Sequence, residues 1–451
     1  MMGLAEAAAV LGGRLQGADR TFQAVCHDSR ALRAGDLFVA LRGPRFDGHD
    51  FLAQAQDLGA AGALVETARP LALPQVVVAD SRAALGRLAA HWRERFRIPL
   101  VAVTGSNGKT TVKEMIAAIL GRLGPVLVTA GNRNNEIGVP LTLLGLRAGH
   151  QRAVVEMGMN HAGEIAYLSA LARPTVALVT NAAEAHLEGL GSVAAVARAK
   201  GEIFGGLREG GVAVINADDP HAGLWRELAA PHEVVTFGLE RPADYSADYQ
   251  PLAEGSRLRL HTPLGEVDMT IPLMGRHNAA NAAAAAACAA QAGAGLEDIR
   301  AGLERLRAVA GRLEVKRARR GAWVLDDSYN ANPASVAAGL EVLRERAGER
   351  VLVLGDMLEL GEAAAEIHRR VGALARRIGI QRLLAVGALA RHAAEAFGPG
   401  GEHFPDHQAL ADRLDGLLGP RVTVLVKGSR GSHMEAVVAA VCSRGSEEGA
   451  A

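Results

Sequence analysis

The residues from Val103 to Thr111, VTGSNGKTT, combine the groups that bind a nucleoside triphosphate. The apolar run Pro99–Val103 precedes them and a helical pattern follows, so the loop joins a strand to a helix. Backbone N–H groups and the helix dipole then point at one position, which favours phosphate. Lys109 adds a cation for the β- and γ-phosphates, and Thr110 offers a hydroxyl to Mg²⁺. The nucleotide-binding residues expected here are Gly105, Ser106, Asn107, Gly108, Lys109, Thr110 and Thr111.

This loop departs from the usual pattern G-x-x-x-x-G-K-[ST], because Val103 stands where that pattern has its first glycine. An ordinary glycine-rich turn is the alternative. The order of strand, glycine, lysine and two threonines favours a compact phosphate loop.

Three further residues could complete a metal-bound nucleotide site. Glu156 ends the strand pattern AVVE, and His186 lies in the loop NAAEAHLEGLGS after the strand pattern VALVT. In open α/β sheets, ligands bind at the carboxyl ends of the strands. Lys200 lies in ARAKGEIF, and only five of the 49 Lys and Arg residues are lysine. A retained lysine is informative because it can offer a neutral amine, which arginine cannot. Solvated positions are the alternative interpretation for His186 and Lys200, and Lys113 is expected to be a solvated helix residue.

The elements that must position these residues fall into three segments, residues 1–97, 98–311 and 312–451. Strand and helix patterns alternate, which predicts an α/β fold with parallel sheets covered on both faces. We expect three domains: a smaller N-terminal α/β domain, a central phosphate-loop-type parallel sheet with flanking helices, and a C-terminal Rossmann-like doubly wound domain. Residues 245–272 predict hairpins and the tail SRGSEEGAA predicts disorder. The main strands are expected at Asp36–Leu41, Gln75–Ala79, Pro99–Val103, Ala153–Glu156, Val176–Thr180, Val212–Ile215, Val234–Phe237, Trp323–Leu325, Val351–Leu354, Leu383–Val386 and Val422–Val426.

Composition excludes several classes of protein. The 49 Lys and Arg residues balance 49 Asp and Glu residues, so no bulk charge favours nucleic acid or an anionic membrane. The three cysteines are far apart, which fits a reducing cytoplasm better than a disulfide framework. The N-terminus lacks a basic region before an apolar core and predicts an amphipathic helix rather than a signal peptide. The alanine-rich stretch Ala279–Gly295 is too short and too weakly apolar to span a bilayer.

The motifs TGSNGKTT and AKGEIF, with Glu156 and His186 between them, resemble the Mur ligase superfamily, which includes folylpolyglutamate synthetases. The resemblance covers essentially the whole chain. It implies that ATP phosphorylates a substrate carboxylate and that an amine then attacks the acyl phosphate. It also implies two Mg²⁺ ions, with Thr110 and Glu156 at the first, and with His186 and a carbamylated Lys200 at the second.

Further site residues follow from the same resemblance. Asn278 and Asn281 in GRHNAANAAAA are implied near the adenine, and Arg312 in GRLEV near the ATP phosphates. Asp327 in DDSYNANP is implied near the nucleotide, although Asp326 beside it leaves the register open by one residue.

Three stretches resemble in particular the members of the family that add D-alanyl-D-alanine to UDP-N-acetylmuramoyl-tripeptide. They are an N-terminal UDP-binding segment, HDSRALRAGDLFVALRGPRFDGHDF, the substrate loop GNRNNEIGVPLTLL, and the C-terminal runs DDSYNANPAS, VLGDMLELG and VKGSRGSHME. The resemblance implies a cytoplasmic monomer. The substrate-binding residues implied are Ser29, Arg30, Asp47, Gly48, His49, Asn134, Asn135, Tyr329, Asn330, Asn332, Asp356, Lys427, Ser429 and Arg430.

Other functions remain as alternatives. A kinase or motor-like NTPase uses the same phosphate loop but needs no carbamate, so Lys200 argues against it. A nucleotide-sugar-binding regulator without catalysis would not need Thr110, Glu156 and Lys200 together. A dinucleotide-dependent oxidoreductase lacks support because no G-x-G-x-x-G opens a helix after a strand. Within the family, another amino-acid-adding muramoyl ligase or a folylpolyglutamate synthetase is the main alternative. The UDP-type N-terminal segment argues against the synthetase, and the absence of an Asp-Asn-Pro-Arg motif argues against the diaminopimelate-adding relative.

Overall fold

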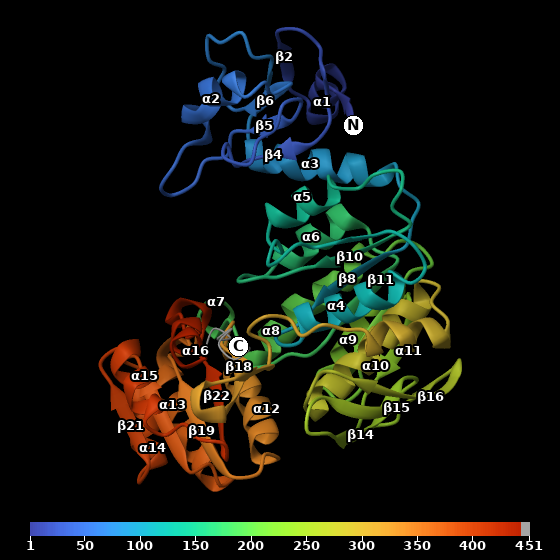
Figure 1. Ribbon diagram of the computed structural model, residues 1–451. Coiled ribbons are helices and arrows are strands. Elements are labelled where there is room, and N and C mark those ends of the chain that lie inside the picture. Colours follow the sequence, from blue (N-terminus) through green and yellow to red (C-terminus); the bar gives the residue numbers. More distant parts are fainter. Residues whose placement is uncertain (443–451) are drawn as a thin grey trace, which may run out of the picture.

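The computed structural model describes residues 1–442 and has the predicted α/β architecture (Figure 1). The tail 443–451, which was predicted to be disordered, lies outside the described residues. Three segments follow one another in space as they do in sequence, with the central segment between the other two (Figure 1). None of the helices within residues 1–442 is both long and apolar enough to cross a membrane.

The N-terminal segment contains a five-stranded sheet in the order β2-β7-β6-β5-β4. Its last helix, α3 (Ser81–Glu94), begins at the N-cap Asp80 and packs against α5 (Gly138–Leu143) and α6 (Glu164–Ala172) of the central segment. The predicted strands at 36–41 and 75–79 are confirmed as β5 and β7. The other elements are β2 (Arg14–Gln16), β4 (Val25–Cys26), β5 (Leu37–Val39), β6 (Gly62–Val65), β7 (Gln75–Val77), α1 (Leu4–Leu11), η1 (Gly48–Phe51) and α2 (Leu52–Asp57).

The central segment is built on a six-stranded parallel sheet in the order β13-β12-β11-β8-β10-β9. Alternate residues of its strands face two separate cores, which explains their continuous apolar runs. Helices α4 (Lys109–Leu120), α10 (Arg276–Gln291) and α11 (Leu296–Glu304) cover one face, and α5, α6, α8 (Val193–Gly201) and α9 (Ala222–Ala229) the other. The strands are β8 (Leu100–Thr104), β9 (Val126–Val128), β10 (Arg152–Glu156), β11 (Val176–Val179), β12 (Val212–Asn216) and β13 (Glu233–Phe237).

The predicted hairpins are a three-stranded antiparallel sheet of β14 (Ser246–Pro251), β15 (Ser256–Thr262) and β16 (Gly265–Ile271). The alanine-rich α10 follows and packs against α4, the helix that starts at the phosphate loop. Because alanine is small, the two helices approach closely and the loop stands on a rigid base.

The C-terminal segment is doubly wound, as predicted. Its sheet has the order β17-β18-β22-β19-β20-β21, and only β17 is antiparallel. Helices α12 (Pro333–Arg344), α13 (Ala364–Arg377) and α14 (Ala390–Phe397) cover one face, and α15 (His407–Asp415) and α16 (Glu435–Val441) the other. The strands are β17 (Glu314–Arg317), β18 (Trp323–Asp327), β19 (Glu349–Leu354), β20 (Arg382–Val386), β21 (Gly401–Phe404) and β22 (Val422–Lys427).

Candidate active site

The phosphate loop connects β8, in the middle of the central sheet, to α4. Its two glycines are required by their surroundings. Gly105 has φ +150°, and a Cβ there would lie 1.8 Å from Thr180 Oγ1; Gly108 has φ +81° and caps α4, and its Cβ would meet Asn281 Oδ1 at 2.7 Å. The loop can therefore lie close to its neighbours only with glycine at these positions.

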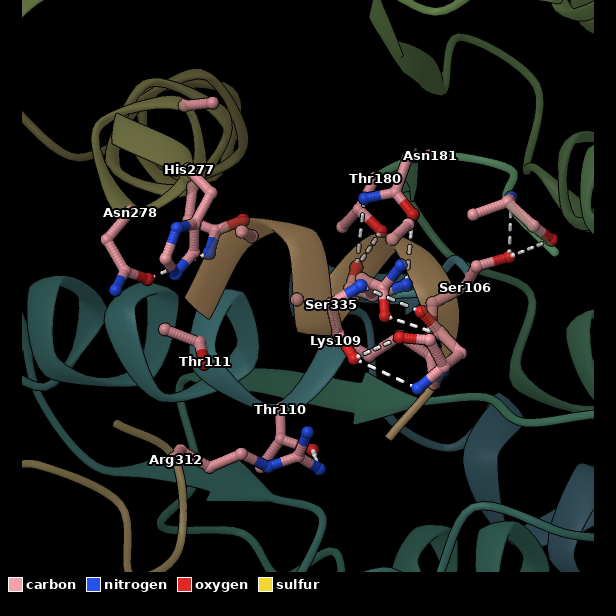
Figure 2. Close-up of a pocket in the computed structure, with 18 of the residues that line it drawn as sticks. Ser106, Lys109, Thr110, Thr111, Thr180, Asn181, His277, Asn278, Arg312 and Ser335 are labelled. Carbon is pink, nitrogen blue, oxygen red and sulfur yellow. Dashed lines mark hydrogen bonds between the residues drawn. The ribbon is translucent and has the colours of Figure 1, made fainter. Parts of the chain in front are cut away.

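The loop is fixed from the side by the residues that follow β11. Thr180 Oγ1 donates to the Asn107 carbonyl at 2.6 Å, and Asn181 Oδ1 accepts from Asn107 N–H at 2.9 Å. Ser106 Oγ accepts from Ala183 N–H at 3.0 Å, and Figure 2 shows these contacts beside Lys109. Sequence reasoning missed Thr180 and Asn181, although polar residues directly after a central strand were the available signal.

The Lys109 ammonium folds back over the loop and donates to the carbonyls of Gly105 at 2.6 Å and Ser106 at 3.2 Å. Burial lowers the pKa of Lys109, Glu156 opposes this shift, and Arg312 adds to it. Glu156 and Arg312 therefore act electrostatically on the same point as Lys109, as a site that neutralises phosphates requires.

A cavity of about 440 Å³ opens beside the loop and is shared by the central and C-terminal segments. This volume lies in the range of ligand sites, roughly 300–1,000 Å³. The predicted residues Asn278 and Asn281 lie in its wall, and Asn281 Nδ2 donates to Asn278 Oδ1 at 3.0 Å. Besides Thr180 and Asn181, sequence reasoning missed four polar or aromatic lining residues, which are Asn216, Phe237, His277 and Ser335. Figure 2 places His277 and Asn278 at one end of the cavity and Ser106 and Lys109 at the other.

The junction between the central and C-terminal segments contributes Arg312. Its Nη2 donates to Thr110 Oγ1 at 3.4 Å, and its guanidinium stacks on the Tyr329 ring at 4.2 Å. Asp327 lies in the cavity wall and accepts from Leu313 N–H and Lys427 Nζ, whereas Asp326 is buried against Lys316 and Ser328. Of the two aspartates, Asp327 is therefore the one that lines the cavity.

Glu156 ends β10 beside the start of the phosphate loop, since it pairs with Val103 in the sheet. Only 2% of its surface is exposed. Its Oε1 accepts from Asn134 Nδ2 at 2.8 Å, while Oε2 has no hydrogen-bond partner. A bare, buried carboxylate oxygen beside a phosphate loop fits a Mg²⁺ ligand. The predicted substrate-binding residue Asn134 therefore contacts this carboxylate in the structure.

The expectation that Lys113 is solvated was wrong. Its side chain is 1% exposed, and Nζ donates to the Thr129 carbonyl at 3.0 Å. Nζ also lies 2.9 Å from Glu114 Oε1 and 4.0 Å from Glu156 Oε2. The helical period directs the Lys113 side chain towards β10 and the loop after β9. The spacing of one turn from Lys109 could not show whether this face of the helix is buried or solvated.

Lys200 lies at the end of α8 and is 1% exposed. No hydrogen bond or ion pair within residues 1–442 involves its side chain. Burial, reinforced by the Lys109 charge, sets the pKa of Lys200 well below its usual value. Burial therefore favours the neutral form of the amine, the form that reacts with CO₂.

His186 caps α7 (Leu187–Leu190) and is partly buried. Its Nδ1 lies 2.8 Å from Oε2 of Glu359, a residue of the C-terminal segment. This hydrogen bond lowers the pKa of Glu359. Sequence reasoning missed Glu359, although it lies inside the singled-out run VLGDMLELG.

The predicted dipeptide loops at the carboxyl edge of the C-terminal sheet are tied to one another. Asn330 accepts from Arg430 N–H at 3.3 Å, and Ser429 Oγ donates to the Ala331 carbonyl at 3.2 Å. Asn332 reaches the central segment, where its Nδ2 donates to Asn107 Oδ1 at 2.8 Å. Asp356 Oδ1 accepts from two backbone N–H groups at the start of α14, which ties this loop to the helix.

The predicted UDP-binding loops follow β4 and β5, which are paired and parallel, so both loops lie at one edge of the N-terminal sheet. Arg30 is exposed and pairs with Asp28, and Ser29 is nearly buried. His49, which η1 places after Gly48, is buried and fully bonded. Its Nδ1 contacts Asp47 Oδ1 at 2.6 Å, and Nε2 accepts from Glu66 N–H at 3.0 Å. The ring therefore anchors the loop and has no free nitrogen for a ligand.

Asn135 also has an architectural role, because its Oδ1 accepts from Ile137 and Gly138 N–H at the start of α5. Across residues 1–442, no three His, Cys, Asp or Glu side chains lie together as a metal site. A cation at Glu156 would therefore need other oxygens, such as the Thr110 hydroxyl and nucleotide phosphates.

Comparisons with known proteins agree with this geometry. Residues 21–93 match the Mur ligase family catalytic domain, residues 103–289 the Mur ligase middle domain, and residues 311–430 the Mur ligase glutamate ligase domain. The chain is 48% identical to UDP-N-acetylmuramoyl-tripeptide–D-alanyl-D-alanine ligase of Escherichia coli K12, over 97% of each chain.

Solved structures give the same result. MurF from Acinetobacter baumannii superposes with a TM-score of 0.92 at 37% identity, covering 97% of this chain and 98% of that one. MurF ligase from Thermotoga maritima in complex with ADP superposes with a TM-score of 0.83 at 28% identity, covering 93% and 97%. An identity of 48% across 97% of the chain leaves no room for a different family, and the chain belongs to the Mur ligases.

Proposed function

We propose that the protein is an ATP-dependent ligase that joins D-alanyl-D-alanine to UDP-N-acetylmuramoyl-tripeptide, releasing ADP and phosphate, in the cytoplasmic synthesis of peptidoglycan precursors. The observation that carries this proposal is the cavity of about 440 Å³ between the phosphate loop and the C-terminal segment. The phosphate loop, Arg312 and Lys427 bring cations to it from both sides. The relative from Escherichia coli, whose name states this reaction, supports the substrate pair.

The three segments divide the task. Residues 1–97 bind the UDP part of the acceptor through the loops at Ser29–Arg30 and Asp47–His49, with His49 as the internal anchor. Residues 98–311 bind ATP, and residues 312–451 bind the incoming dipeptide through the loops around Asn330, Asp356 and Ser429. We propose in addition that the protein acts as a monomer.

In the first step, the acceptor carboxylate attacks the γ-phosphate of ATP to form an acyl phosphate and ADP. Lys109 and the backbone N–H groups of the loop stabilise the charge that develops on the phosphate oxygens. Arg312 adds a second cation from the junction, and its stacking on Tyr329 restricts its orientation. Asn278 and Asn281 orient the adenine end at the far side of the cavity.

In the second step, the dipeptide amine attacks the acyl carbon and phosphate leaves. The third segment must hold this amine at about 3–3.5 Å from the carbon, because only such positioning yields the full rate gain. Asn332, which contacts Asn107 of the phosphate loop, links the dipeptide loops to the reacting phosphate. Exclusion of water by the two segments protects the acyl phosphate from hydrolysis.

We propose that the site holds two Mg²⁺ ions. Thr110 and the bare oxygen Oε2 of Glu156 would hold the first, and His186 and carbamylated Lys200 the second. Bound there, they would neutralise the phosphate charge. The lowered pKa of the buried Lys200 amine supports the carbamate, because only the neutral amine can take up CO₂.

The test is ADP release by the purified protein with UDP-N-acetylmuramoyl-tripeptide, with and without D-alanyl-D-alanine. We expect rapid release only with both substrates, together with a product whose mass equals that of the acceptor plus the dipeptide minus water. ADP release that does not depend on the dipeptide, or a preference for diaminopimelate or glutamate as the amine substrate, would assign the chain to another member of the family.

A further inference from the structure

The loop 181–186 lies between the phosphate loop and the C-terminal segment and contacts both. On one side, Asn181 accepts from the backbone N–H of Asn107. On the other side, Glu359 lies 2.8 Å from His186, and Arg370 donates to both carboxylate oxygens of Glu184 at 2.9 and 3.0 Å. The C-terminal segment therefore touches this loop at two side chains, only one of which is a predicted site residue.

The contact between Glu359 and His186 is reinforced by the backbone. Glu188 N–H donates to the Glu359 carbonyl at 3.3 Å, and α7 packs against η4 (Gly361–Ala363). Figure 1 shows α7 next to the C-terminal segment, although it belongs to the central one. Two chain segments more than 170 residues apart thus meet at this histidine.

Both partners also have an unusual backbone conformation. Six non-glycine residues among residues 1–442 have positive φ, and His186 (φ 56°) and Glu359 (φ 62°) are two of them. Non-glycine residues avoid this region because Cβ clashes with the backbone, and such strain persists only where the surrounding structure enforces it. Two strained residues from different segments that face each other indicate a contact maintained for orientation.

The chemistry of the pair decides which nitrogen of His186 is free. A carboxylate only accepts hydrogen bonds, so the ring must carry a proton on Nδ1. The neutral ring then has its lone pair on Nε2, the atom that can bind a metal ion or accept a hydrogen bond from a ligand. A metal-binding histidine commonly has its second nitrogen fixed by a carboxylate in this way.

We propose that Glu359 is a positioning residue supplied by the C-terminal segment, which fixes the tautomer and ring orientation of His186 when that segment docks on the central one. The inference rests on the proposed function, in which His186 serves the second metal. Its consequence is that the histidine acquires its competent form only in the docked arrangement. Docking would thus complete the site and coincide with arrival of the dipeptide loops.

The contact between Glu359 and His186 is too weak to hold the two segments together, and its role is to orient the His186 ring. The Glu359 side chain is 55% exposed, and exposed pairs contribute little to association because water and salt screen them. The pair of Arg370 and Glu184 is similarly exposed, links the same two segments, and does not touch His186. Arg370→Ala is therefore a matched control for the loss of one exposed contact between the segments.

The experiment compares the parent with Glu359→Ala, Glu359→Gln and Arg370→Ala in the full chain with ADP and Mg²⁺. Ring ¹⁵N NMR, assigned through His186→Gln, reports the tautomer directly. We expect an Nδ1-protonated ring in the parent, in Arg370→Ala and in Glu359→Gln, whose amide oxygen still accepts. We expect an Nε2-protonated ring, the usual form of a free histidine, in Glu359→Ala.

Kinetics give the second measurement. We expect Glu359→Ala to lower kcat about 10- to 100-fold, as outer-shell substitutions do, with KM for ATP and for the acceptor changed less than threefold. Glu359→Gln should recover most of kcat. An unchanged tautomer in Glu359→Ala, or an equal kcat loss in Arg370→Ala, would overturn the proposal. If the parent lacks ligase activity, the proposed function fails, while the tautomer measurement still tests the contact.

Discussion

The buried amine of Lys200, which we propose as the site of the carbamate, should destabilise the folded protein. Within residues 1–442 it has no hydrogen-bond or ion-pair partner, and burial holds its pKa well below the value of 10.5 for a free lysine. The unfolded state therefore binds a proton that the native state lacks, over the pH interval between the two pKa values. In that interval the free energy of unfolding rises with pH, by up to about 1.4 kcal/mol per pH unit.

The perturbation is Lys200→Met, which keeps an unbranched side chain and removes the amine. In CO₂-free buffer we expect this variant to be inactive but more stable than the parent at pH 7.5. Because the penalty falls as pH rises towards 10.5, the parent should become more stable relative to the variant as pH is raised from 7.5 to 9.5. Bicarbonate should stabilise only the parent, because the carbamate forms only on the native amine.

The assay can be made local. Trp225 of α9 is fully buried, and its Nε1 donates to the Ala197 carbonyl of α8, the helix that carries Lys200. In a background with Trp92→Phe and Trp323→Phe, the other two of the three tryptophans, its fluorescence reports unfolding of this region in denaturant. Equal midpoints and equal pH slopes for parent and variant would show that Lys200 keeps its proton, and would refute the neutral-amine argument.

Three further predictions concern the other parts of the site. Burial lowers the pKa of His277 from 6.5 to about 4, so the parent should lose about 2 kcal/mol more stability than His277→Gln when pH falls from 7.5 to 5; equal losses in denaturant unfolding would contradict this. Arg30→Ala should raise KM for the UDP substrate but not for ATP, with the exposed Arg20→Ala as control, and equal damage to both KM values would point to misfolding. A non-hydrolysable ATP analogue together with the UDP substrate should lower the radius of gyration measured by small-angle scattering. An unchanged radius of gyration, with a chain that is already closed in the absence of ligands, would refute this prediction.

The central strands of both large sheets could be predicted because both of their faces are buried. Such strands, for example LVAVT in β8 and VALV in β11, are continuous apolar runs and do not alternate between apolar and polar residues. The unpredicted strands include β21, with the sequence GEHF, and β17, with EVKR, which are polar and lie at the two edges of the C-terminal sheet. An edge strand has one neighbour and often an exposed face, so its sequence carries a weaker pattern.

The site was predictable where a residue acts through its own chemistry and not where it acts through its neighbours. Gly105, Lys109 and Thr110 belong to a local motif, and the structure places them as expected. Asn134 and Glu359 act by holding a carboxylate or a histidine that lies far away in the sequence. No local spacing records such a partner, so sequence alone could not assign their contacts.

Because lysine is scarce in this chain, the positions of the five lysines indicate where the site lies. Three of the five lysines, Lys113, Lys200 and Lys427, are each 1% exposed, and Lys109 and Lys427 line the cavity. Arginine is not excluded from the interior, since Arg93 is fully buried; its guanidinium, however, spreads its donors over the carbonyls of Phe96, Ala172 and Ile98.

At the site, each lysine places a compact head group at the end of an aliphatic stem. Lys109 contacts the phosphate loop, Lys427 pairs with Asp327 at 2.5 Å, and burial lowers the pKa of Lys200. An ammonium has a single charged atom and can offer a neutral amine, whereas a guanidinium spreads its charge over three nitrogens and stays charged even when it is buried. A chain that otherwise prefers arginine therefore keeps lysine where the chemistry depends on the proton or on the small size of the head group.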